Sequence, residues 1–272
     1  SWRMFETLIG KGFQVEFHSH AKAILSVDFP EAVAELEQAL NSSTIPIEEI
    51  IAGGGGEAKG TQRLRKTLTL LNWPKFVFII EKIINGQPRE SVSHEIDHVR
   101  TFKSGARIAL EIEWNNKDPF YDRDLENFKR LHADGAISVG IIVTRGRALQ
   151  ANMRNLVRRF LNERQIEGFL DLEQWNCSPT SKQRAEISRR MNRSKNPLSF
   201  RDAFTEKFVS DKFGEATTHW EKLERRVQRG VGNPCPLLLI GLPDSIVTFH
   251  EREAALQEID TEADPEDDNL ED

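Results

Sequence analysis

The sequence has little cysteine and no apolar run long enough to span a membrane. Its two cysteines, Cys177 and Cys235, lie far apart and lack the short spacing of a metal-binding motif. We therefore expect them to be reduced, as in a cytoplasmic protein. A membrane helix needs about 20 consecutive apolar residues, and no stretch approaches that length, so we expect no membrane association. The first residues do not resemble a signal peptide either.

Basic charge is scarce overall but abundant in one part of the chain. The 272 residues carry 37 Lys and Arg against 43 Asp and Glu, a net charge of −6 that argues against a nucleic-acid partner. Residues 251–272 alone hold eleven acidic residues and one Arg, whereas residues 145–229 hold nineteen basic and eleven acidic residues. A basic body with an acidic tail allows binding to a polyanion. We expect the tail to end in disorder.

One short segment carries acidic residues in a regular pattern. Apolar and polar residues alternate over residues 107–114, which predicts a half-buried strand. Side chains two residues apart share a face of a strand, so Glu111 and Glu113 stand side by side. Residues 103–105 form a turn signal, and a hairpin around it would bring Asp97 to the same place. Three carboxylates at one point repel each other, and a Mg²⁺ ion would offset that repulsion.

The neighbouring segments decide between this metal site and an ordinary solvated Glu-x-Glu pair. A helix capped by Asp122 or Asp124 is expected to run to about Ala133. Residues 137–144 are almost continuously apolar, which predicts a central strand. This order of strand, turn, strand, helix and strand favours the metal site. Further helices are expected over residues 30–40, 149–163 and 216–229, and a last buried strand at or near the sheet edge over residues 236–242.

Two other segments, a pair of histidines and a glycine-rich stretch, are weaker candidates for a functional site. His18 and His20 would share a face of a strand and could bind a metal, although ordinary polar positions fit them better. Residues 53–56 are glycine-rich, but Lys59 is not followed by Ser or Thr, which disfavours a phosphate loop. This loop leads into the basic residues 62–66, which could contact DNA phosphates or form a solvated surface.

The arrangement of Asp97, Glu111 and Glu113 resembles the core of the PD-(D/E)xK nucleases, in which an Asp is followed by Glu or Asp, any residue and Lys on the adjacent strand. Two departures stand out, because Glu113 occupies the position of that Lys and no Pro precedes Asp97. Restriction endonucleases of the BamHI and BglII type carry Glu or Gln at this position. The resemblance to their BglII-related branch covers residues 14–240, is strongest over 94–145, and includes the segments 53–60 and 111–125.

This resemblance implies an α/β fold with a restriction-endonuclease-like central mixed β-sheet flanked by helices on both faces. It implies a single nuclease domain over residues 1–250, with a basic insertion near 173–200 and the acidic tail at 251–272. The partner would be double-stranded DNA, and palindromic targets imply a homodimer. Such an enzyme works in the cytoplasm of a bacterium or archaeon. A cognate DNA methyltransferase would belong to the same system without being a bound subunit.

The implied activity is Mg²⁺-dependent, sequence-specific hydrolysis of DNA phosphodiesters, as in a type II restriction enzyme. Asp97 and Glu111 would hold one or two Mg²⁺ ions, for which Mn²⁺ would substitute. Glu113 would bind metal or act as general base, and the main-chain carbonyl of Ile112 would be a further ligand. Candidate DNA contacts are Lys59, Arg63, Arg65, Lys66, Asn116, Lys117, Arg145, Arg147, Lys182, Arg184, Arg189, Arg190 and Arg193. A structure-specific repair or recombination nuclease and a non-catalytic DNA-binding protein are the alternatives.

Overall fold

The structure is a computed structural model and describes residues 4–53 and 59–250. The chain divides into two units. The first comprises residues 1–44, 61–153 and 212–246, and the second comprises residues 45–60, 154–211 and 247–272. The acidic tail expected at 251–272 lies outside the described residues. The single nuclease domain over residues 1–250 stays a prediction.

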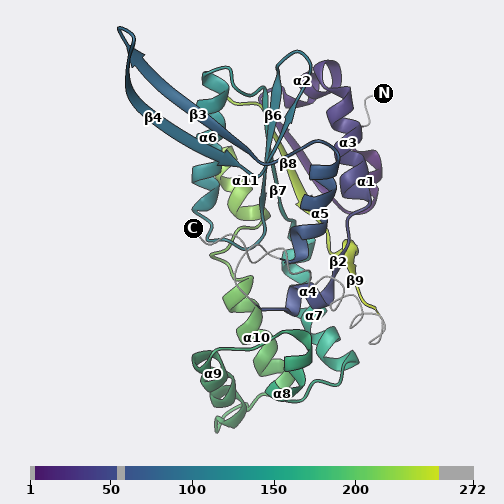
Figure 1. The fold of residues 1–272 in the computed structure, drawn as a ribbon. Helices are drawn as coiled ribbons and strands as arrows, with labels where there is room; N and C mark the ends of the chain where they lie inside the picture. The colour runs from purple at the N-terminus through teal and green to yellow at the C-terminus, as the bar shows by residue number, and fades with distance from the viewer. Residues whose placement is uncertain (1–3, 54–58, 251–272) are drawn as a thin grey trace. The chain divides into compact units, whose positions relative to one another are not determined.

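A five-stranded mixed sheet forms the centre of the first unit (Figure 1). Its strands follow the order β1-β8-β7-β6-β5, in which β6, β7 and β8 are parallel and the two edge strands are antiparallel to their neighbours. The predicted central strand is confirmed as β7, and the last strand, β8, lies one position in from the edge. The strands are β1 (Gln14–His18), β5 (His98–Thr101), β6 (Arg107–Glu113), β7 (Val139–Arg145) and β8 (Leu237–Leu242).

Helices cover both faces of this sheet, as predicted. On one face α6 (Phe120–Ala133) and α11 (Trp220–Gln228) share a hydrophobic core with Ala109 of β6. On the other face α2 (Ala21–Asp28) packs against β7 and β8. Every residue of β6 after Arg107 is buried, so both faces of the strand are covered and the prediction of a half-buried strand is wrong. The remaining helices of this unit are α1 (Glu6–Gly10), α3 (Pro30–Asn41), most of α5 (Lys59–Leu70) and η2 (Asp244–Ile246).

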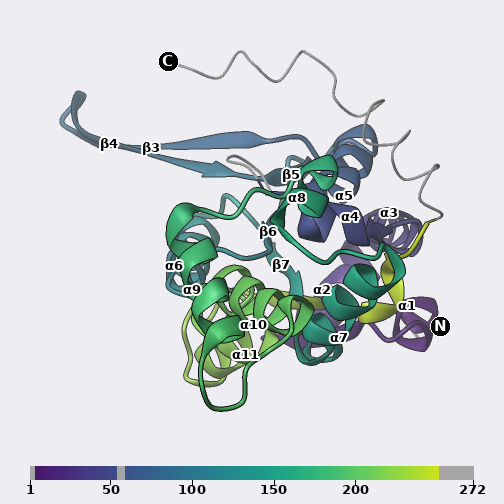
Figure 2. The same cartoon turned by 90° about the horizontal axis from the view of Figure 1, so that it is seen from below.

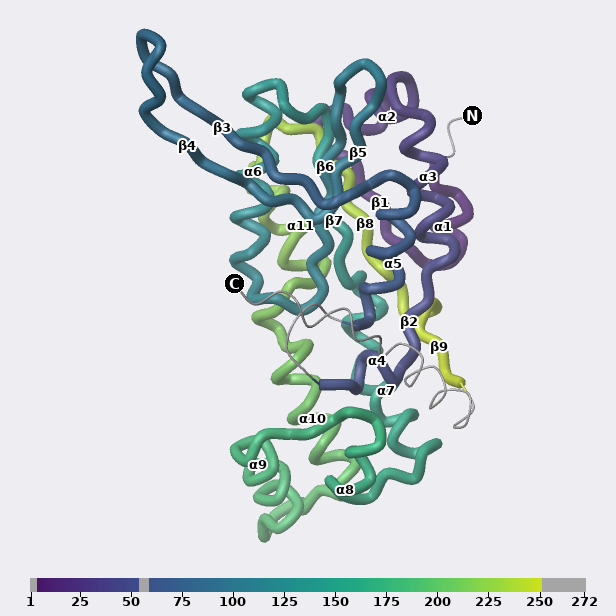
Figure 3. Tube along the Cα trace, viewed as in Figure 1, coloured from purple at the N-terminus to yellow at the C-terminus, as the bar shows by residue number. Residues whose placement is uncertain are grey.

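A two-stranded ribbon extends from the sheet of the first unit (Figure 2). It consists of β3 (Phe76–Ile84) and β4 (Gln87–Ile96), which pair antiparallel around Asn85 and Gly86. Both turn residues have positive φ values, 51° and 75°, as a two-residue hairpin turn favours. The base of the ribbon is held in the core, and a bend at Asp97 then leads from β4 into β5, which lies beside β6 (Figure 3).

The second unit is mainly helical. The long helix α7 (Arg147–Glu163) begins in the first unit and ends in this one, and it confirms the helix predicted over 149–163. The expected basic insertion near 173–200 contains α9 (Ser181–Asn192), whose N-terminus has a capping box between Thr180 and Gln183. The other elements are β2 (Ile45–Pro46), α4 (Ile47–Ile51), α8 (Phe169–Leu172), η1 (Glu173–Trp175), α9 (Ser181–Asn192), α10 (Phe200–Lys212) and β9 (Val247–Thr248).

Two predicted helix starts are wrong. Helix α6 begins at Phe120 with Pro119 as its N-cap, so neither Asp122 nor Asp124 caps it. Helix α11 begins at Trp220 rather than at residue 216, because Thr217 pairs with Lys117 in an isolated β-bridge before the helix starts. Helix α3 confirms the helix predicted over residues 30–40. In the described part of the chain, no helix is long and apolar enough to cross a membrane.

Candidate metal centre

The pairing of β5 with β6 brings Asp97 to Glu111. His98 faces Leu110 in the register of the two strands, so the preceding residue, Asp97, comes opposite Glu111. The two carboxyl groups are close enough to share a hydrogen bond. The predicted hairpin is thus confirmed, and it joins residues that lie fourteen positions apart in the chain.

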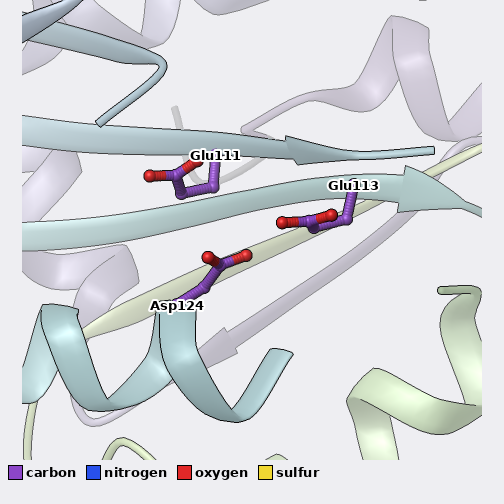
Figure 4. Close-up of side chains that lie close together, drawn as sticks. All are labelled: Glu111, Glu113 and Asp124. Atoms are coloured by element: carbon purple, nitrogen blue, oxygen red, sulfur yellow. The ribbon is translucent and has the colours of Figure 1, made fainter. Parts of the chain in front are cut away.

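A third element adds a carboxylate that the sequence analysis did not select. Glu111, Glu113 and Asp124 each offer an oxygen atom, and these atoms all lie within 4.8 Å of one another. Figure 4 shows the three side chains pointing toward one another from the strand and from α6. Their exposed fractions are 4%, 2% and 1%. Leu125 and Phe128 are fully buried in the core beside them, and they hold α6 against the sheet.

Arg65, a predicted DNA contact, lies inside this centre. Its Nη1 is 3.2 Å from Oδ2 of Asp97, and its Nη2 donates to the carbonyl oxygen of Ile112 at 3.3 Å. The backbone N–H of Ile112 donates to the same Oδ2 at 3.0 Å. Asp97 and Arg65 thus satisfy both backbone groups of Ile112 beyond the end of β5. The carbonyl predicted to bind metal accepts a hydrogen bond from a guanidinium instead.

Two further polar side chains orient the carboxylates. Asn116, another predicted DNA contact, donates from Nδ2 to Oε2 of Glu113 at 2.7 Å. Nη2 of Arg123 lies 3.8 Å from Oε1 of Glu113 and 3.2 Å from Oδ1 of Asp124. The other oxygen of Asp124, Oδ2, is buried and has no hydrogen-bond donor among the described residues. An orphaned buried carboxylate oxygen indicates that a ligand belongs beside it.

The charges in this centre do not balance. Four carboxylates, those of Asp97, Glu111, Glu113 and Asp124, face the two guanidinium groups described above. When all of them are ionised, two negative charges remain in excess. Carboxylate oxygens are the ligands that Mg²⁺ and Mn²⁺ accept. The donor set therefore fits one divalent cation.

The pKa values reflect this imbalance. Burial raises the pKa of Glu111 well above its ordinary value, and the charges of Asp124 and Asp97 raise it further. Burial also raises the pKa of Asp124, as does its contact with Glu113. Burial would raise the pKa of Asp97 too, but Arg65 and the hydrogen bonds it accepts hold that pKa below its ordinary value. Asp97, whose ionised form the protein stabilises, therefore stands next to Glu111, whose ionised form the protein destabilises.

Arg145, predicted to contact DNA, is a buried structural residue. It is fully buried, and burial lowers its pKa to about 10. Its guanidinium donates to the carbonyl of Trp114, to Oε1 of Gln150 at 2.6 Å and to Oγ1 of Thr217 at 2.9 Å. It therefore joins the end of β7 to the segment that follows Glu113. The prediction of a DNA contact at Arg145 is wrong for this conformation.

The remaining sequence candidates lie outside the carboxylate cluster. His18 is 3.2 Å from Glu16 on β1, and β8 and β7 separate that strand from β6. Arg147 pairs with Glu224, and Lys117 is exposed after β6. Three candidates lie on α5, namely Lys59, Arg63 and Lys66. Five lie on or directly after α9 in the second unit, namely Lys182, Arg184, Arg189, Arg190 and Arg193.

The metal-free protein should lose stability as the pH rises. Glu111 and Asp124 have raised pKa values, so each stabilises the fold when protonated and opposes it when ionised. Asp97 has a lowered pKa and contributes its full stabilisation above its unfolded value of 3.8. We therefore expect the melting temperature in EDTA to decline as the pH rises above the unfolded values of 4.5 for Glu111 and 3.8 for Asp124. Glu111→Gln should flatten that decline, and calorimetry at increasing pH measures it.

The exposed carboxylate of Glu126, also on α6, provides the control for this measurement. Glu126→Gln should keep the wild-type slope of melting temperature against pH. Equal slopes for wild type and Glu111→Gln would show that the buried carboxylates do not set the pH dependence.

Replacing Arg145 should impair folding rather than DNA binding. Arg145→Met leaves the Trp114 carbonyl and the side chains of Gln150 and Thr217 without their donor. Losing one partner of such a buried network costs about 3 kcal/mol of unfolding free energy. Urea unfolding measures this loss. If Arg145→Met kept the wild-type stability but bound DNA more weakly, the DNA contact predicted from the sequence would be supported.

Comparison with models of known protein families gives a match. A family model described as restriction endonuclease BglII/BglIII matches residues 13–242 of the chain. This range contains the sheet, α6 and all four carboxylates of the centre. No curated protein matches the chain.

Proposed function

The chain belongs to the BglII/BglIII restriction endonuclease family, and from this premise we propose that it cuts double-stranded DNA at the buried carboxylate centre with Mg²⁺ as cofactor. The family makes it a type II site-specific deoxyribonuclease. Membership favours a sequence-specific enzyme over the structure-specific nuclease and the non-catalytic DNA-binding protein. The metal, the residue roles and the dimer are our proposals.

The observation that carries the proposal is the uncompensated charge of the centre. Glu111 and Glu113 are nearly inaccessible, and when they, Asp97 and Asp124 are all ionised, the four carboxylates exceed the neighbouring guanidinium groups by two charges. Buried charges are rare unless paired or coordinated to a metal. A catalytic cation is a sufficient reason to maintain such a cluster.

We assign the role of holding the ion to Glu111, Glu113 and Asp97. A bound Mg²⁺ would supply positive charge against the scissile phosphate and would acidify a bound water, and Mn²⁺ would do the same. The Ile112 carbonyl becomes available as a ligand only when Arg65 releases it. Arg65 offers a guanidinium at the edge of the centre, and this group suits a phosphate.

Glu113 is the group that we assign to proton transfer. Oε2 of Glu113 accepts a hydrogen bond from Asn116, and this contact fixes the orientation of the carboxylate. Oε1 has no arginine within hydrogen-bond distance, because Arg123 lies 3.8 Å away, and this oxygen can accept a proton from water. Glu113 takes the position that Lys holds in most PD-(D/E)xK nucleases.

The proposed enzyme is a homodimer that places one such centre on each DNA strand. The palindromic targets expected for this family support a two-fold axis. We also propose that basic residues of α5, with Lys117 and Arg147, contact the DNA backbone. Phosphate contacts of this kind orient a protein on the duplex but carry no sequence information.

The second unit offers a separate set of basic residues on α9. Arg189 and Arg190 both pair with Glu186, at 2.7 and 3.0 Å, and lower its pKa to about 2. Arg184 donates to the Pro179 carbonyl at 3.1 Å. Lys182 and the nearby Arg193 are exposed. We propose that these two residues contact phosphates and that the paired arginines support them.

The central test is Glu111→Gln. The amide keeps the shape of the side chain but removes one carboxylate from the cation site. We expect cleavage of plasmid DNA with Mg²⁺ to fall by about 1,000-fold, because a catalytic metal contributes several kcal/mol. Retained DNA binding is expected in a gel-shift assay without metal. Gel analysis of the wild-type products should show discrete bands, as site-specific cutting requires.

The control is Glu126→Gln, which should cut at the wild-type rate. Cleavage by Glu111→Gln at a rate close to that of the wild type would contradict the assignment. Cutting by the wild type in EDTA would exclude the metal.

The α9 contacts can be tested through salt dependence. Lys182→Ala and Arg193→Ala should each weaken non-specific DNA binding and lower the slope of log affinity against log salt by about one. Lys207→Ala is the matched control, because its ammonium is 3.0 Å from Asp211. Binding curves at several NaCl concentrations measure the slopes. Identical slopes for all three variants would exclude α9 from the interface.

A further inference from the structure

We propose that Asp124 on α6 is a further metal ligand, and that in the DNA-free protein a divalent cation binds first among Glu111, Glu113 and Asp124, before Arg65 releases Asp97 and the Ile112 carbonyl. This inference rests on the proposed Mg²⁺-dependent function and specifies where its cation binds. It assigns to Asp124 a role that the strand motif, which contains only residues of the hairpin, does not include.

The first support is the geometry of the three carboxylates. Their oxygen atoms lie within 4.8 Å of one another, so all three surround one position where a cation can bind (Figure 4). Each residue is at least nine-tenths buried. The positions are set by rigid elements, since Glu111 and Glu113 lie on a central strand and Asp124 lies on a helix packed on that strand.

The second support is the unpartnered oxygen of Asp124. Its Oδ2 accepts no hydrogen bond from the described residues when the neighbouring carboxyl groups are ionised, although only 1% of the residue is exposed, and Asp124 and Glu113 can share a hydrogen bond only when one of them is protonated. Its Oδ1 accepts from Arg123, whose guanidinium stacks on Phe120 and is 57% exposed. Arg123 therefore occupies one oxygen of Asp124 from the solvent side. The other oxygen is left for a cation in the interior.

The third support is that the alternative ligands are occupied. Arg65 contacts both Asp97 Oδ2 and the Ile112 carbonyl, at 3.2 and 3.3 Å. The same Oδ2 also accepts from the Ile112 N–H. A cation at that position must first displace a guanidinium from two acceptors. A cation among the other three carboxylates does not have to displace Arg65.

A purely structural role for Asp124 explains less. As a partner for Arg123 alone it would need no burial, because an exposed ion pair forms equally well in water and contributes little. An isolated Asp at this position would also be more stable as a neutral side chain, since burial disfavours its charge. The cation site accounts for both the burial and the open oxygen.

The test measures Mn²⁺ binding to the full chain without DNA. Electron paramagnetic resonance detects the binding as a loss of the signal from free Mn²⁺. Asp124→Asn is almost isosteric and should weaken Mn²⁺ binding by about tenfold or more, because it removes one charged ligand. Asp97→Asn should weaken it less. Glu126→Gln removes an exposed carboxylate from the same helix and should leave the affinity unchanged. Asp124→Ser gives a second variant if the amide does not fold.

The outcomes separate this inference from the proposed function. Wild-type affinity in both Asp124 variants would overturn it, as would a larger loss for Asp97→Asn than for Asp124→Asn. Absence of Mn²⁺ binding to the wild-type chain would also overturn it. If Asp124→Asn loses Mn²⁺ and the wild type cuts no DNA, the assignment of Asp124 stands and the proposed function fails.

Discussion

The dominant interaction in the carboxylate centre is the mutual repulsion between its buried carboxylates, and the rest of the structure has to oppose it. Glu111 and Glu113 stand on one face of β6, and Asp124 approaches the same face from α6. Water cannot screen charges that are almost completely inaccessible. The core around Leu125 and Phe128 holds them together in spite of this repulsion. The fold thus supplies the energy that keeps a cation-binding arrangement in place before any cation arrives.

The backbone around Ile112 explains how the hairpin serves the same centre. Strand β5 begins at His98, so β6 extends past it, and the N–H and C=O of Ile112 have no partner from β5. Asp97 and Arg65 take these two groups. One contact set therefore completes the sheet and positions the carboxylate of Asp97 beside Glu111. Asp97 and Arg65 are consequently structural residues as well as candidates for chemistry.

Features set by local periodicity could be predicted from the sequence, whereas features set by tertiary contacts could not. Alternation over residues 107–114 located β6, and the turn at 103–105 gave the pairing with Asp97. Asp124 was misread as a helix cap, because an Asp near a helix N-terminus has that local explanation. Asp124 lies one residue before Leu125 and four before Phe128, so the helical period places it beside the apolar face of α6. This spacing was the sequence signal that Asp124 is buried. Arg145 was misread because charge predicts exposure, whereas its partners come from distant segments.

The replacement of the expected Lys by Glu113 changes which groups can carry charge and protons. The positive groups of the centre come from helices, with Arg65 on α5 and Arg123 on α6. A guanidinium remains protonated at any physiological pH and cannot accept a proton from water. Both arginines can hold a phosphate or a carboxylate, but neither can act as a base. In the proposed reaction the proton must therefore go to a carboxylate, and Glu113 has the oxygen best placed to receive it.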